Sequence, residues 1–274
     1  MKEVLRAKLQ GTGRDAVSAG HLAREYLQAS ILDKLQTAGA MVPLCFLGGT
    51  ALRFLYEIRR YSEDLDFSLY RGGGYDLEAY ARHVVGRLRA EGFVSEASLR
   101  LDRAVQVAWL GFPGLLHDLG ISRQAQAKLK IKLEVDTNPP EGATRRTTVV
   151  RKHDYVLNLQ HHDRASLLAG KLHAVLQRDP PKGRDFYDLF WYLSDRSWPG
   201  PNLTLLNNAL RQTGWKGARL TERSWRQAVR RRLAGLDWTT LRRDVEKLLA
   251  PGERAEWMTA QALEQLVSDS ATRR

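Results

Sequence analysis

Two acidic residues and a glycine-rich turn are the residues of this chain whose types and spacing best suit chemistry. Gly48-Gly49-Thr50 interrupts an apolar run and precedes a helical pattern, and the pair Asp64 and Asp66 follows later in the chain. Glycine has no Cβ, so the backbone of the turn can approach a ligand closely, and N–H groups at a helix start can bind phosphate oxygens together with the Thr50 hydroxyl. The turn is therefore predicted to bind phosphate.

The two acidic residues are spaced to point the same way. Asp64, Asp66 and Ser68 alternate with apolar residues, so a strand through them would carry the polar side chains on one face. Two carboxylates placed in this way can bind Mg²⁺, which takes oxygen ligands and usually shares them with substrate phosphates. Each pattern alone is common, since most Gly-Gly turns are only turns and most alternating acids are a solvated strand face. Their order along one segment favours metal-dependent nucleotide chemistry.

A second alternating segment supplies a third acidic residue. Over residues 129–136 apolar and polar residues alternate, which is typical of a half-buried strand whose polar face ends at Asp136. A third carboxylate can bridge to a second metal ion and activate the attacking hydroxyl of an in-line displacement. On its own, Asp136 is better explained as a strand-end residue before the turn at 137–140.

Two helical patterns carry the remaining charged candidates. Lys171 lies beside an apolar stripe that contains Leu168 and Leu172, and Asp185 lies three residues before Asp188 in the next helical segment. A lysine beside such a stripe can reach into a cleft. Taken alone, the same residues fit two exposed helices joined by surface ion pairs, each worth at most about 1 kcal/mol.

Four segments in this order resemble the nucleotidyltransferase toxins of the AbiEii/AbiGii group, which includes the mycobacterial MenT enzymes. The segments are the Gly-Gly-Thr turn, RYSEDLDF at 60–67, KLKIKLEVDTNPP at 128–140 and LLAGKLHAVLQRDPPKGRDFYDLFWYL at 167–193. The resemblance covers about residues 40–195, and four ordered motifs are more specific than any one of them. It implies a metal-dependent nucleotidyltransferase that acts as the toxin of a bacterial toxin–antitoxin or phage-defence system.

The resemblance also implies a role for each candidate residue. The implied roles are triphosphate binding by Gly48, Gly49, Thr50, Ser62 and Lys171, binding of Mg²⁺ or Mn²⁺ by Asp64, Asp66 and Asp136, and catalysis by these acids with Lys171 and Asp185. The implied substrate is an NTP and the implied acceptor is the 3′ end of tRNA, so that aminoacylation and translation are blocked. A cognate antitoxin is the implied partner. Since phosphate on Ser62 would disturb the site by charge and bulk, phosphorylation there is a hypothesis for inhibition.

The net charge of +12 is unevenly distributed along the chain. Residues 123–152 carry eight Lys and Arg against three acids, residues 211–250 carry eleven against four, and together they account for the whole excess. Basic surfaces attract polyanions through phosphate contacts and counterion release. Solubility alone could explain any single arginine, but as a set they favour an RNA acceptor over a small molecule. Trp215 and Trp225 lie in the second stretch and could stack on bases.

The succession of patterns predicts a bilobed α+β fold. Strands are expected at 44–47, 65–70, within 93–109 and at 128–136, and helices at 21–38, 50–58, 76–90 and almost throughout from Asp163, which would cap the first of the later helices. We therefore expect a nucleotidyltransferase-like mixed sheet flanked by helices in residues 1–155. Residues 156–274 would form a mainly helical lobe that completes the active-site cleft.

Composition narrows the setting. No apolar run approaches the roughly 20 residues of a membrane span, and the polar start MKEVLRAKLQ lacks a signal-peptide core, so a cytoplasmic protein with no membrane partner is expected. The single cysteine, Cys45, lies in an apolar strand pattern and is expected to be buried. His161-His162-Asp163 has no second ligand pair at a suitable spacing, so no zinc site is expected.

Two other functions stay open at this stage. The enzyme could transfer a nucleotide to a protein hydroxyl or to a small molecule, in which case removal of RNA would not affect the transfer. The chain could also be a binding module for RNA or another partner that has kept the fold and lost the chemistry. That module would bind RNA without Mg²⁺ and would be indifferent to Asp66→Ala. The intact Asp-x-Asp pair argues against it, because a relic has little reason to retain two mutually repelling carboxylates.

Overall fold

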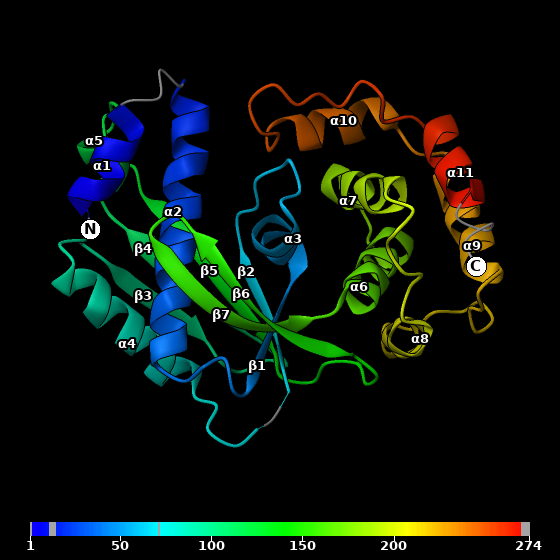
Figure 1. The fold of residues 1–274 in the computed structure, drawn as a ribbon, viewed down its shortest axis with the longest axis horizontal. Helices are drawn as coiled ribbons and strands as arrows, with labels where there is room; N and C mark the ends of the chain where they lie inside the picture. Colours follow the sequence, from blue (N-terminus) through cyan, green and yellow to red (C-terminus); the bar gives the residue numbers. More distant parts are fainter. Residues whose placement is uncertain (1, 11–14, 71, 270–274) are drawn as a thin grey trace. The chain divides into compact units, whose positions relative to one another are not determined.

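The structure, a computed structural model, describes residues 2–10, 15–70 and 72–269 and has a mixed α+β fold (Figure 1). Two compact units can be distinguished. Unit 1 consists of Met1–Glu57, Tyr61–Asn138 and Thr147–His161, and unit 2 consists of Ile58–Arg60, Pro139–Arg146 and His162–Arg274.

A seven-stranded mixed sheet is built from the described residues and lies chiefly in unit 1. In order across the sheet the strands are β3 (Glu96–Arg100), β4 (Val105–Phe112), β5 (Leu129–Asp136), β2 (Leu65–Leu69), β1 (Leu44–Leu47), β7 (Tyr155–His162) and β6 (Arg145–Lys152). β1 is antiparallel to β2 and parallel to β7, and β2 is parallel to β5. The mixed sheet predicted from the alternating segments is therefore confirmed.

The strands β6 and β7 were not predicted. In β7, Tyr155, Leu157 and Leu159 are buried and alternate with exposed or half-buried residues, so a period of two was present in the sequence. β6 is mostly exposed at the edge of the sheet and is rich in Arg and Thr, and an edge strand with little burial has no apolar alternation to detect.

Helices cover the sheet in unit 1. These are α1 (Lys2–Gln10), α2 (Ala16–Thr37), α3 (Gly48–Tyr56), α4 (Leu77–Ala90) and the short α5 (Leu115–Asp118). Asp15 and Asp76 cap α2 and α4 by accepting a backbone N–H from the first turn. α2 and α4 pack on each other and on the strands β3 to β5 (Figure 1). Their apolar faces and those strands form the core of the unit, in which Cys45 is 1% exposed, as expected.

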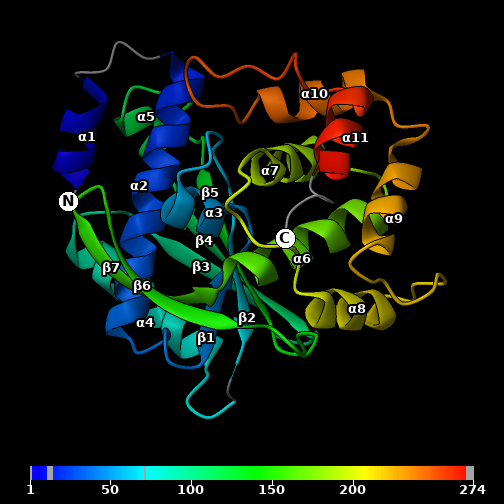
Figure 2. The same cartoon turned by 45° about the vertical axis from the view of Figure 1, so that its right-hand side comes forward.

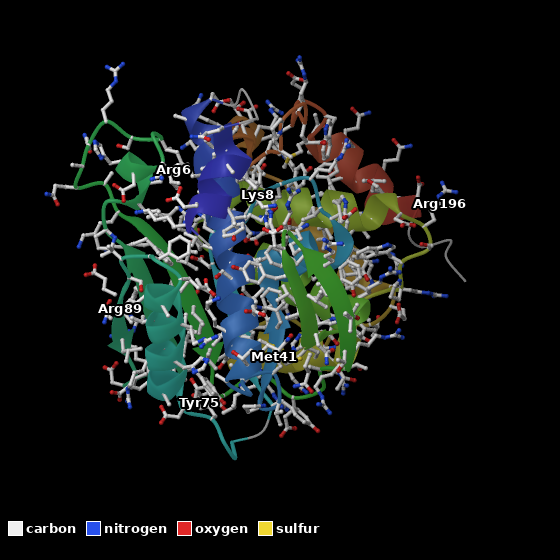
Figure 3. All side chains as sticks on the ribbon, turned by 60° about the vertical axis from the view of Figure 1, so that its left-hand side comes forward. Arg6, Lys8, Met41, Tyr75, Arg89 and Arg196 are labelled. Carbon is white, nitrogen blue, oxygen red and sulfur yellow. The ribbon has the colours of Figure 1, made fainter. Side chains whose placement is uncertain are left out.

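Polar side chains tie the outer elements of unit 1 to its framework. Arg6 and Lys8 project from α1, and Lys8 pairs with Asp154 in the turn between β6 and β7 at 3.1 Å (Figure 3). Arg89, near the end of α4, donates two hydrogen bonds to the Ser95 carbonyl at 3.0 and 2.8 Å (Figure 3). These contacts fix the start of β3 and the β6–β7 hairpin.

Unit 2 is mainly helical in its described residues, as expected from the sequence after Asp163. Its helices are α6 (Arg164–Gln177), α7 (Gly183–Ser194), α8 (Leu203–Gln212), α9 (Ser224–Leu233), α10 (Trp238–Glu246) and α11 (Ala260–Asp269). Asp163 caps α6 as predicted, accepting from Ser166 N at 2.8 Å. α6 and α7 lie side by side, and α10 and α11 pack on α7 (Figure 1, Figure 2).

The first residue of α7 has no room for a side chain. A Cβ on Gly183 would lie 1.9 Å from the Leu241 carbonyl oxygen in α10. The Gly183 N–H donates to Asp244 of the same helix at 2.8 Å. α10 therefore reaches the start of α7 closely enough to require glycine there. Among the described helices, none is long and apolar enough to cross a bilayer.

Candidate active site

The Gly-Gly-Thr turn and the second acidic residue lie against each other in unit 1. Leu47 is opposite Asp66 in the β1–β2 register, and α3 starts directly after it at Gly48, earlier than the predicted helix. Gly48 has φ of +80°, and a Cβ on it would lie 2.1 Å from Asp66 Oδ2. The glycine is therefore required twice, for a left-handed backbone and for the close approach of the Asp66 carboxylate.

Thr50 holds the first acidic residue in place. Its side chain is fully buried, and its hydroxyl donates to the backbone carbonyl of Asp64. Because a hydroxyl has one proton to donate, that proton is committed to the chain, and phosphate oxygens can accept none from it in this conformation. Thr50 thus positions Asp64, which directly precedes β2. Binding of phosphate by the Thr50 hydroxyl stays a prediction.

The register of β2 with β5 brings further acidic residues to the same face. Asp66 is opposite Glu134, and Ser68 is opposite Asp136. Neighbouring strands lie about 4.8 Å apart, so Glu134 is the closer neighbour of Asp66 in register, and Asp136 is one diagonal step away. Burial raises the pKa of the Asp136 carboxyl, although a hydrogen bond from Asn138 N acts in the opposite direction.

Glu134 was missed by the sequence prediction. Its carboxylate pairs with Lys132 at 2.7 Å, along the same face of β5. The alternation in residues 129–136 placed it on the polar face, but only the pairing of β5 with β2 shows which polar residue lies opposite Asp66. That pairing joins segments far apart in the sequence, and no local pattern encodes it.

The acidic residues fit a metal ion that is shared with a substrate. In the part of the chain that the structure describes, no three His, Cys, Asp or Glu side chains are grouped to hold a metal ion by themselves. Mg²⁺ is commonly bound by one or two carboxylates with substrate phosphates and water completing its shell. The hard oxygen donors of Asp66, which lies beside Gly48, and of Asp64, two residues earlier in the chain, suit this second arrangement.

A buried carboxylate anchors α3, the helix that begins at the turn. Arg53 of α3 pairs with Glu25 of α2 at 2.6 Å, and His153 Nε2 lies 3.4 Å from the other carboxylate oxygen. Burial acts to raise the pKa of Glu25, but His153, Arg53 and the charge of Lys152 outweigh it and lower that pKa to about 2. Glu25 is therefore ionised in the folded protein, and it anchors α3 through Arg53.

The segment before the acidic residues is also held. The Ser62 carbonyl accepts a hydrogen bond from Gln28 at 3.0 Å. Tyr61 stacks on His21 with ring centroids 4.8 Å apart, and Arg53 lies 4.8 Å over the Tyr61 ring. The backbone that leads to Asp64 is thus fixed on several sides, while contact of Ser62 with a nucleotide stays a prediction.

The two candidates of unit 2 belong to one buried network of charges. Lys171 of α6 lies 3.7 Å from Asp185 and 2.6 Å from Asp188, both in α7. Arg178 also pairs with Asp185, and Arg60 pairs with Asp188 through two hydrogen bonds of 2.6 Å. The two aspartates are buried, which does not agree with the alternative of exposed helices joined by surface ion pairs.

Asp188 is the second residue that the sequence prediction left without a role. It is 0% exposed, and burial alone would raise the pKa of its carboxyl, but the charges of Arg60 and Lys171 hold that pKa below its usual value. The spacing of three residues from Asp185 was visible in the sequence. Its pairing with Arg60, 128 residues earlier, was not.

The basic stretches are only partly available to a polyanion. Trp225 is 1% exposed and cannot stack on a base, so that expectation was wrong. Arg232 donates to the carbonyls of Val175 and Arg178 near the end of α6, so it serves the fold of unit 2. Exposed basic residues remain in both stretches, and they include Arg146, Arg151, Lys216, Arg223, Arg230, Arg231 and Arg243.

Comparisons with known proteins define the class of this protein. The family model described as the nucleotidyl transferase AbiEii toxin of a type IV toxin–antitoxin system matches residues 30–265. The crystal structure of JHP933 from Helicobacter pylori is similar, with 16% identity, a TM-score of 0.53 and coverage of 92% of this chain and 91% of that chain. A second structure, provisionally described as a nucleotidyltransferase from H. pylori, has 17% identity, a TM-score of 0.54 and coverage of 91% and 94%. No curated protein matches the chain.

At 16% and 17% identity, the two H. pylori structures show a shared fold and no more. The match to the family model shows the class of activity. The protein is a nucleotidyltransferase. It belongs to the AbiEii family of nucleotidyltransferase toxins of type IV toxin–antitoxin systems, because the family model spans most of the chain. Membership implies an NTP substrate and an antitoxin partner.

Proposed function

We propose that this toxin transfers nucleotides from an NTP to RNA in an Mg²⁺-dependent reaction in the cytoplasm, with the 3′ end of tRNA as the acceptor. The observation that carries the proposal is the approach of the Asp66 carboxylate to the Gly48 backbone, where a Cβ would lie 2.1 Å from Asp66 Oδ2. That approach places a hard oxygen ligand beside a turn suited to phosphate. A tRNA extended at its 3′ end cannot be aminoacylated, and translation stops.

The reaction is an in-line displacement at the α-phosphorus of the NTP. The acceptor hydroxyl oxygen forms a bond to the α-phosphorus, the bond to the β-phosphate bridging oxygen breaks, and pyrophosphate leaves with that electron pair. A bound Mg²⁺ would stabilise the charge on the attacking and leaving oxygens. Asp64 and Asp66 would hold the ion, and Asp136 or its neighbour Glu134 would take the proton of the attacking hydroxyl.

The groups of the chain that bind the nucleotide are proposed residue by residue. Gly48 and Gly49 would bind phosphate oxygens with backbone N–H groups, with Ser62 beside them. Lys171 would bind the triphosphate, and Asp185 would support it.

The RNA acceptor is proposed from the exposed basic residues. Arg146 and Arg151 in β6 and Arg230 and Arg231 in α9 are exposed, and phosphate contacts by such residues release counterions and make binding salt-dependent. Exposed positive charge on this scale is not needed to bind a small molecule. We further propose that the toxin is inhibited by its antitoxin and acts in phage defence.

The test is nucleotide transfer by the purified protein. Wild type is incubated with Mg²⁺, total tRNA and each α-labelled NTP in turn, and the label in RNA and in protein is resolved. We expect label in tRNA with wild type and with Asp102→Ala, which removes an exposed acid, and none with Asp66→Ala or with EDTA. Label in protein alone would replace the RNA acceptor by a protein acceptor. Equal labelling of tRNA by Asp66→Ala would contradict the assigned site.

A further inference from the structure

Asp188 is the centre of the buried network in unit 2. Arg60 Nε and Nη2 donate to its two carboxylate oxygens at 2.6 Å each, and Lys171 Nζ lies 2.6 Å from Oδ2. The Arg60 and Asp188 side chains are 1% and 0% exposed. A bidentate guanidinium–carboxylate pair fixes both the position and the plane of the carboxylate, so Oδ2 is held still for Lys171.

Arg60 is itself held by the backbone of unit 2. It forms an isolated antiparallel bridge with Leu249, and the Arg59 carbonyl accepts from Ala250 N at 3.1 Å. The main chain that carries the Arg60 guanidinium is therefore held in place. Arginine makes two parallel bonds to one carboxylate, which lysine cannot do, and this geometry leaves Asp188 one orientation.

The charges in the network leave one cation over. The five residues comprise three cations, Arg60, Lys171 and Arg178, and two carboxylates, Asp185 and Asp188, so the network as a whole has one positive charge in excess. The Lys171 side chain is 14% exposed, whereas Arg60 and Asp188 are shielded from solvent. Of the two cations that contact Asp188, Lys171 is thus the one that reaches solvent.

We propose that Asp188, clamped by Arg60, is a positioning residue that aims Lys171 at the polyphosphate of the NTP. The inference rests on the proposed function for the identity of the ligand. A lysine has four rotatable bonds, and fixing its ammonium group before the ligand arrives lowers the entropy lost on binding. Asp188 and Arg60 touch no substrate and act only through Lys171.

The probe is inorganic tripolyphosphate, titrated calorimetrically at low salt into the full-length protein. Lys171→Ala removes the ligand-binding group. The double variant Arg60→Met with Asp188→Leu removes the clamp as one pair of opposite charges, a replacement that proteins often tolerate, and Lys171 keeps Asp185 at 3.7 Å. Arg60→Lys is made in parallel because it keeps both charges and loses only the paired geometry. Arg196→Ala removes an exposed positive charge of unit 2 that lies outside both basic stretches, and it serves as the control.

We expect Lys171→Ala and the double variant each to weaken tripolyphosphate binding about tenfold, the size of one lost charged hydrogen bond. Adding Lys171→Ala to the double variant should cost nothing more, because an unaimed lysine contributes little. Arg60→Lys should show a smaller loss of the same kind, and Arg196→Ala should change the affinity less than about twofold. A purely structural role would lower the melting temperature and leave both the affinity and the effect of Lys171→Ala unchanged, which would overturn the inference.

Nucleotide transfer by the same variants separates this inference from the proposed function. If tripolyphosphate binding follows the expected pattern while wild type labels neither RNA nor protein, the proposed function fails and the positioning role stands. If wild type labels tRNA and the clamp variants keep both its KM for NTP and its tripolyphosphate affinity, the function stands and the positioning role fails. A wild type that does not bind tripolyphosphate also overturns the positioning role.

Discussion

Gly48→Ala tests the geometry on which the proposed site depends. The substitution adds one methyl group at a residue with φ of +80°, next to the carboxylate of Asp66. Two separate effects are expected. The left-handed backbone becomes strained, and the new Cβ displaces the acidic group that we propose as a metal ligand.

The size of each effect follows from the structure. A left-handed conformation costs a residue with a Cβ roughly 1–2 kcal/mol, which lowers the melting temperature of a chain of this size by about 2–8 °C. The Cβ would start 2.1 Å from Asp66 Oδ2, and an ordinary contact begins at 3.4 Å, so the carboxylate or the turn must move by at least 1.3 Å. A displacement of about 1 Å in a catalytic geometry can lower the rate about 100-fold. We therefore expect a modest loss of stability and a large loss of nucleotide transfer.

The matched control is Gly39→Ala, also in unit 1. Gly39 has φ of +76°, but a Cβ on it would meet no heavy atom within 4 Å. It should lose as much stability as Gly48→Ala from backbone strain and keep its activity. Thermal unfolding and initial rates of label transfer are measured on both variants. Full activity in Gly48→Ala, or an equal loss of activity in both variants, would refute the role assigned to the contact with Asp66.

Three further predictions concern charge and packing. Folding lowers the pKa of Glu25 from 4.5 to about 2, which contributes about 3 kcal/mol to the free energy of unfolding above pH 4.5. This contribution is lost as the pH falls towards 2. Glu25→Gln should therefore be less stable than wild type near neutral pH and should approach wild type in acid. Glu134→Gln should lower the rate of transfer about 100-fold, at least as much as Asp136→Asn, because the register puts Glu134 opposite Asp66, which we propose as a metal ligand. Gly183→Ala should destabilise the protein by about 1–3 kcal/mol, since its Cβ would overlap a carbonyl of α10.

Each of these predictions has its own readout. Urea unfolding of wild type and Glu25→Gln at several pH values measures the difference in unfolding free energy, and a difference that stays constant with pH would contradict the Glu25 assignment. Activity in Glu134→Gln with none in Asp136→Asn would make Asp136 the third acid. For Gly183→Ala the control is Gly170→Ala in α6, where a Cβ would meet nothing within 4 Å. That control should be neutral or stabilising, and equal melting temperatures for the two variants would exclude the overlap.

The local elements of the site could be predicted because their signals are local. The alternation around Asp66 and Asp136 predicted β2 and β5, and the stripe beside Lys171 predicted α6. Asp163 was identified as a cap from its position before a helical pattern, and it is one. Periodicity and capping depend on neighbours within a few residues, so a single sequence contains them.

The partners of the site residues could not be predicted for the opposite reason. The position of Glu134 opposite Asp66 depends on which strands pair and in which register, and the clamp on Asp188 depends on Arg60 far away in the chain. β6 escaped detection because a mostly exposed edge strand needs no apolar alternation. These features are decided by tertiary pairing, and several arrangements would satisfy the same local patterns.

The way the two units share the chain limits how the protein can be taken apart. Ile58–Arg60 belongs to unit 2, although the residues on both sides of it belong to unit 1. A fragment of residues 156–274 would keep Asp188 and Lys171 but lose the Arg60 guanidinium that makes two hydrogen bonds to the carboxylate, and breaking a buried ion pair by removing one partner is destabilising. The remaining fragment would keep Arg60 and lose the acid. A split reporter or a domain exchange near residue 155 would therefore use two incomplete pieces, and a nonsense mutation there would leave one incomplete piece rather than a smaller toxin.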